Sequence, residues 1–151
     1  MAFRFVWWLR AIVVLLSVQF LLGVWVNLFG RVPMTTSLVK ALEYTGDPAL
    51  TAHMVLAVVI AVLGFLIALA SFGGTPVPWL RSMTVAGLLS VLWSYEWGFQ
   101  FLVTGFSSGR DSFLMAVGFI VAMGFYGVAQ SLVANHPPAK IARASPSKNA
   151  S

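Results

Sequence analysis

Four polar residues interrupt the apolar stretches of this 151-residue chain and are the first candidates for chemistry: Asn27, His53, Glu96 and Gln100. A histidine and a carboxylate at a similar membrane depth can form a ligand, quinone or proton site. Glu96 and Gln100 are four residues apart, so a helix places them on one face, where they can hydrogen-bond. The same residues also suit a polar network that fixes helix packing, and His53 alone suits a position facing lipid head groups. The sequence leaves these interpretations open.

Residue types that support other chemistries are missing from the sequence. The chain has no cysteine, which excludes disulfides and thiol catalysis. It also has no phosphate-binding loop, zinc-binding helix motif or nucleophile elbow. We therefore predict no catalytic residue and no metal site, and we expect no enzymatic activity.

Long apolar stretches must position the four polar residues. Each is as long as the ~20 residues with which a helix crosses a bilayer, and they cover residues 5–29, 50–72, 80–103 and 112–134. Charged residues make up only 9% of the chain, against about 25% in soluble domains. Backbone groups in lipid need internal partners, and the stretches do not alternate as barrel strands do. The predicted fold is an all-α, integral membrane four-helix bundle over residues 1–134.

The charges outside these stretches predict the orientation. Four spans place both termini on one side, where the sequence has six basic residues and no acidic one, against three of each on the other side. Because cytoplasmic loops are rich in Lys and Arg, we predict cytoplasmic N- and C-termini in the cell (cytoplasmic) membrane, with residues 135–151 as a disordered basic tail. The net charge of +5 follows from this topology and needs no nucleic acid. The expected partners are the lipid bilayer and other membrane subunits or a second copy.

The second and fourth stretches align without gaps at an offset of sixty residues, which pairs Gly64 with Gly124. This alignment favours a duplicated two-helix hairpin. In it, His53 is paired with Phe113. Small residues such as Gly64 and Gly87 are predicted to let the helices approach closely, because backbones in membranes pack tightly where side chains are small.

Three short segments carry a resemblance to a known family: Gln-Phe-Leu-Leu-Gly at 19–23, Asn-Leu-Phe-Gly at 27–30, and His53 followed four residues later by alanine. Together they resemble small four-span membrane proteins related to haem A synthase and the b-type cytochrome four-helix bundles. In that family, histidines on the second and fourth spans bind haem. The resemblance implies haem b as a cofactor with His53 as one ligand. Phe113 stands at the position of the second ligand, so the resemblance allows a relative that keeps only the scaffold or binds haem across a dimer.

Three functions are consistent with these features. The first is a non-catalytic multi-pass membrane protein that serves as a small subunit or accessory of a larger membrane assembly, such as a respiratory one. The second is a haem b- or quinone-binding redox membrane protein that uses His53. The third is a small transporter or proton-conducting protein that uses Glu96.

Overall fold

The computed structural model describes residues 2–30, 47–73, 77 and 79–135, and their regular secondary structure is entirely helical. The four helices are α1 (Ala2–Phe29), α3 (Pro48–Ser71), α4 (Leu80–Val103) and α5 (Gly109–Asn135). Each coincides with one predicted apolar stretch, and the ends differ by at most a few residues. The all-α bundle is therefore confirmed. The predicted disorder of the tail concerns residues 136–151, which lie outside the described residues.

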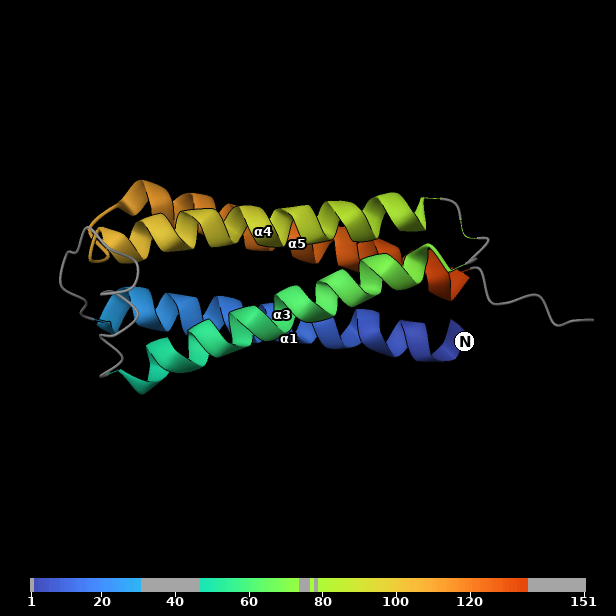
Figure 1. Cartoon of the computed structure of the whole chain (residues 1–151), viewed down its shortest axis with the longest axis horizontal. Helices are drawn as coiled ribbons and strands as arrows, with labels where there is room; N and C mark the ends of the chain where they lie inside the picture. The colour runs from blue at the N-terminus through green and yellow to red at the C-terminus, as the bar shows by residue number, and fades with distance from the viewer. Residues whose placement is uncertain (1, 31–46, 74–76, 78, 136–151) are drawn as a thin grey trace, which may run out of the picture.

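The helices form a bundle in which α1 packs against α3 and α5, and α4 packs against the same two helices (Figure 1). The first residue of α1 and the last residue of α5 lie at the same end of the bundle. These neighbour relations are the ones that a two-fold axis between an α1–α3 hairpin and an α4–α5 hairpin would produce. The duplication of a hairpin remains a prediction.

Three helices are long and apolar enough to cross a membrane: Phe5–Phe29, Pro48–Ser71 and Gly109–Asn135. The helix α4, which contains the polar residues Glu96 and Gln100, is not among them. Large apolar side chains are nevertheless exposed on all four helices, as the surface of a membrane protein requires. The structure thus supports a membrane protein with three candidate spans, and the fourth span remains a prediction.

Tyr126 lies in the core of the half of the bundle that is remote from the α4–α5 turn. We call this part of the bundle the Tyr126 half. The Tyr126 side chain is completely buried. A methyl group added at Gly64 would lie 2.8 Å from its hydroxyl oxygen, and one added at Gly87 would lie 2.9 Å from its ring. Only glycine leaves room for this ring, which confirms the predicted close packing at both positions. Gly124, by contrast, has no neighbouring atom within 4 Å of an added methyl group.

Candidate functional site: a cavity near the α4–α5 turn

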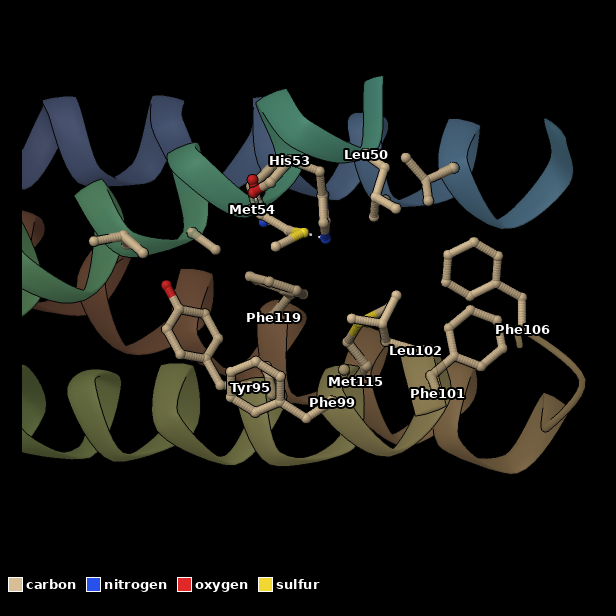
Figure 2. A pocket seen from close by; sticks show the side chains of 17 residues that line it. Leu50, His53, Met54, Tyr95, Phe99, Phe101, Leu102, Phe106, Met115 and Phe119 are labelled. Carbon is tan, nitrogen blue, oxygen red and sulfur yellow. Dashed lines mark hydrogen bonds between the residues drawn. The ribbon is translucent and has the colours of Figure 1, made fainter. Parts of the chain in front are cut away.

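A cavity of about 400 Å³ lies inside the other half of the bundle, close to the α4–α5 turn (Figure 2). We call it the loop-end cavity. Its volume falls in the range of ~300–1,000 Å³ in which proteins bind small molecules. All four helices line it, mostly with aliphatic, aromatic and methionine side chains. The polar residues in the lining are Gln19, His53, Ser94 and Tyr95.

The start of α3 positions His53. Asp47 caps the helix by accepting a hydrogen bond of 2.8 Å from the Ala49 backbone N–H, and Pro48 follows at the first helical position. His53 comes about one and a half turns later and extends toward the cavity (Figure 2). The ring lies against Gly23 of α1, where an added methyl group would be 3.1 Å from its Cε1 atom. The absence of a side chain at Gly23 therefore makes the space that the imidazole occupies.

Gln19 of α1 holds this imidazole through its amide group. The Gln19 Nε2 atom donates a hydrogen bond of 3.0 Å to the His53 carbonyl oxygen and lies 3.3 Å from the His53 Nε2 atom. An amide has two N–H groups and can donate to both acceptors, which leaves the ring proton of a neutral His53 on Nδ1. The His53 Nδ1 and Gln19 Oε1 atoms then remain buried without a partner among the described residues.

The hydroxyl group of Tyr95 is also buried; it lies near the Ala61 backbone but makes no hydrogen bond within 3.5 Å in the described part of the chain. Among residues 2–30, 47–73, 77 and 79–135, three of the five such atoms thus belong to residues that line this one cavity: Gln19, His53 and Tyr95. Buried polar groups without partners are rare in native proteins, and a bound ligand or water usually explains them. Their concentration here indicates a binding site.

The α4–α5 turn closes one end of the cavity with two stacked rings. The helix α4 ends in a Schellman motif: the Phe106 N–H donates to the Phe101 oxygen at 3.0 Å, and the Gly105 N–H donates to the Leu102 oxygen at 3.1 Å. Phe106 has a φ of 64°, a strained conformation for a bulky residue. This conformation places its ring 5.0 Å from that of Phe101, centroid to centroid. The strained backbone of Phe106 thus positions its ring to form an aromatic wall of the cavity together with Phe101 (Figure 2).

The cavity reaches the surface of the bundle between α3 and α4. Val58 of α3 and Phe99 of α4 both line it, and they are also 62% and 44% exposed on the outside. Both side chains at this opening are apolar. A lipid-soluble molecule could therefore enter from the side, without crossing the aqueous phase.

The structure does not bring the four predicted site residues together. Only His53 lines the loop-end cavity. Glu96 and Gln100 lie on the exposed face of α4 and are joined by a hydrogen bond of 3.1 Å from Gln100 Nε2 to Glu96 Oε1. Asn27 is exposed on α1 and borders a separate, smaller pocket between α1 and α5. The four residues therefore do not form a single polar cluster, and His53 does not lie beside Glu96.

Haem, the cofactor that the resemblance implies, fits this lining poorly. Phe113, at the position of the second ligand, is 66% exposed on the outside of α5. Met54 and Met115 do line the cavity and have suitable sulfur atoms. However, Gln19 engages the His53 Nε2 atom, and no cationic side chain of the described lining can pair with the two haem propionates. The described residues instead suit an uncharged ligand.

Sequence reasoning missed Gln19 and Gly23 as the neighbours of His53, and Tyr95 as a further polar residue of the cavity lining. The sequence shows a polar residue in the first span, but not that α1 and α3 pair Gln19 with His53, because their register depends on tertiary packing. The described residues contain no group of three metal-binding side chains. In comparisons with protein families, curated proteins and solved structures, nothing matches this chain.

Proposed function

We propose that the protein binds an uncharged, lipid-soluble ring molecule of the quinone class in the loop-end cavity. The observation that carries this proposal is that three residues lining an otherwise apolar cavity, Gln19, His53 and Tyr95, each have a buried polar atom without a hydrogen bond. Quinone carbonyl groups accept hydrogen bonds, which suits the Tyr95 hydroxyl and the ring N–H of His53 after small side-chain rotations. The aromatic walls suit the ring, and the α3–α4 opening suits an isoprenoid tail that remains in the lipid.

The proposed role is binding in a multi-pass membrane protein, either alone or as an accessory subunit of a larger membrane assembly. We propose that α4 forms a fourth span, with both termini in the cytoplasm. Its length of 24 residues, equal to that of α3, and its packing between α3 and α5 support the span. The excess of basic residues on the side of the termini supports the orientation. The test is a pair of reporter fusions, with a fluorescent protein after residue 151 and alkaline phosphatase after residue 107. We expect both reporters to be active; an inactive phosphatase would contradict the fourth span.

Binding is tested by titrating the purified protein in nanodiscs with a short-tailed quinone and recording the quenching of tryptophan fluorescence. Trp93 and Trp97 lie on α4 on either side of Tyr95, so quenching reports on a nearby ligand. We expect saturable binding, and about a two- to tenfold loss of affinity in Tyr95→Phe, since one hydrogen bond contributes about 0.5–1.5 kcal/mol.

Filling the cavity provides the sharper test. Ala57 lines the cavity, so Ala57→Leu should reduce quinone affinity by at least tenfold (an order-of-magnitude estimate for steric exclusion). Ala52 lies on the same helix with its side chain exposed and outside the lining, so Ala52→Leu is the matched control and should bind normally. Equal affinity in the two variants, or quenching that never saturates, would contradict the proposal.

A further inference from the structure

The exposed face of α4 contains the Glu96–Gln100 pair, and an apolar surface surrounds it. Leu92 and Trp93 are exposed one turn before Glu96, and Leu89 is 60% exposed on the same face two turns before it. We call this surface the Glu96 face. None of these residues lines the loop-end cavity.

The corresponding surface of α3 shows what a lipid-facing helix of this chain looks like. After Thr51, every exposed residue of α3 is apolar, including Val55, Val62 and Leu69. A carboxylate and an amide on the outside of α4 break that rule. Acidic residues within membranes almost always face protein, because their exposure to lipid is costly. If α4 spans the membrane, as the proposed topology has it, the Glu96 face must be covered by protein.

The hydrogen-bond donors and acceptors of this face could pair with those of an identical face on a second copy of the chain. Gln100 uses one amide N–H for Glu96 Oε1 and has a second to donate. The other carboxylate oxygen of Glu96 accepts no hydrogen bond that the described residues show. Two parallel copies of α4 related by a two-fold axis would each donate from Gln100 to Glu96 of the other. A two-fold interface repeats every contact, so both polar groups of both copies are satisfied.

We propose that the Glu96 face is the interface with a second copy of this chain, held by reciprocal Gln100–Glu96 hydrogen bonds. The chain has no cysteine, so single cysteines can be introduced without interference. Leu89→Cys places a thiol on this face, and Val62→Cys, at 54% exposure, places one on the lipid-facing side of α3. In vesicles treated with an oxidant, we expect a covalent dimer from Leu89→Cys and none from Val62→Cys. Equal cross-linking of the two would overturn the proposal.

Substitution of Glu96 separates hydrogen bonding from simple apolar contact. In the Leu89→Cys background, Glu96→Leu should reduce the cross-linked fraction at least fivefold (an order-of-magnitude estimate for lost interhelical hydrogen bonds), although the face becomes more apolar. Glu96→Gln keeps a hydrogen-bonding amide and should retain most of the cross-link. An unchanged fraction in Glu96→Leu, or dependence on a different co-purifying protein, would overturn the proposal.

A labelling control distinguishes failure of this inference from failure of the proposed topology. A membrane-impermeant maleimide should not label the L89C thiol in sealed or opened vesicles. Labelling would contradict the fourth span itself, and with it the reason for covering this face. An unlabelled thiol that does not cross-link would contradict the dimer alone, and neither result depends on quinone binding.

Discussion

The close packing of Gly64 against Tyr126 makes a specific prediction about Gly64. An alanine there would place its methyl group 2.8 Å from the Tyr126 hydroxyl oxygen, with the next contacts at 3.4 Å and 3.5 Å. Overpacking of this kind costs about 1–3 kcal/mol, while replacing a helical glycine by alanine contributes about 1 kcal/mol of stability. We therefore expect Gly64→Ala to lower the free energy of unfolding by up to about 2 kcal/mol.

The same geometry predicts that Tyr126→Phe removes this penalty. Without the hydroxyl oxygen, the remaining contacts of the new methyl group are ordinary, so Gly64→Ala should be neutral or stabilising in the Tyr126→Phe background. The coupling free energy between the two substitutions should be about 1–3 kcal/mol. The free energies are measured by SDS titration in mixed micelles, followed by tryptophan fluorescence.

Gly124→Ala is the matched control for Gly64→Ala, because the two glycines are aligned in the sequence but Gly124 has open space around it. It should be neutral or gain up to about 1 kcal/mol. If Gly64→Ala is as stable as Gly124→Ala, or if Tyr126→Phe leaves its cost unchanged, the packing argument is refuted.

Two further predictions concern His53. Protein expressed with ample haem and purified in mild detergent should show no Soret band, because the described lining has no cation for the propionates; a band that disappears in His53→Ala would contradict the argument against haem. Gly23→Leu should displace the imidazole and lower quinone affinity, since even a methyl group would lie 3.1 Å from the ring, while Gly127→Leu, which has open space around it, should bind as the wild type does.

The apolar stretches predicted the helices well, but not which way each helix faces. In a soluble bundle, the buried face is recognised by its apolar stripe. Here both the core and the surroundings are apolar, and α5 accordingly has no amphipathic periodicity. Phe113 and Met115 look alike in the sequence, yet Phe113 lies outside and Met115 lines the cavity. The rotation of α5 follows from packing, which the pattern of one helix does not contain.

The small residues were more informative, because their effect does not depend on surrounding polarity. Gly64 and Gly87 were predicted to allow close approach, and both contact Tyr126. Gly124 is aligned with Gly64 in the sequence but borders open space. A glycine in a membrane helix therefore marks either a contact or a bare surface, and the identity of the large side chain that enters the gap decides between them. Nothing in the sequence assigned Tyr126 to that role.

The cavity follows from the difference between the two halves of the bundle. At the Tyr126 half, Gly64 of α3 and Gly87 of α4 leave room for the Tyr126 side chain of α5, which fills the space between the helices. Toward Pro48, α3 diverges from α4 (Figure 1), and the side chains between them include Met54, Leu102 and the Phe101–Phe106 stack. Bulky side chains thus keep the helices apart in this half, whereas small residues allow them to approach closely in the other half. This difference between the two halves is encoded in the side chains of the helices themselves.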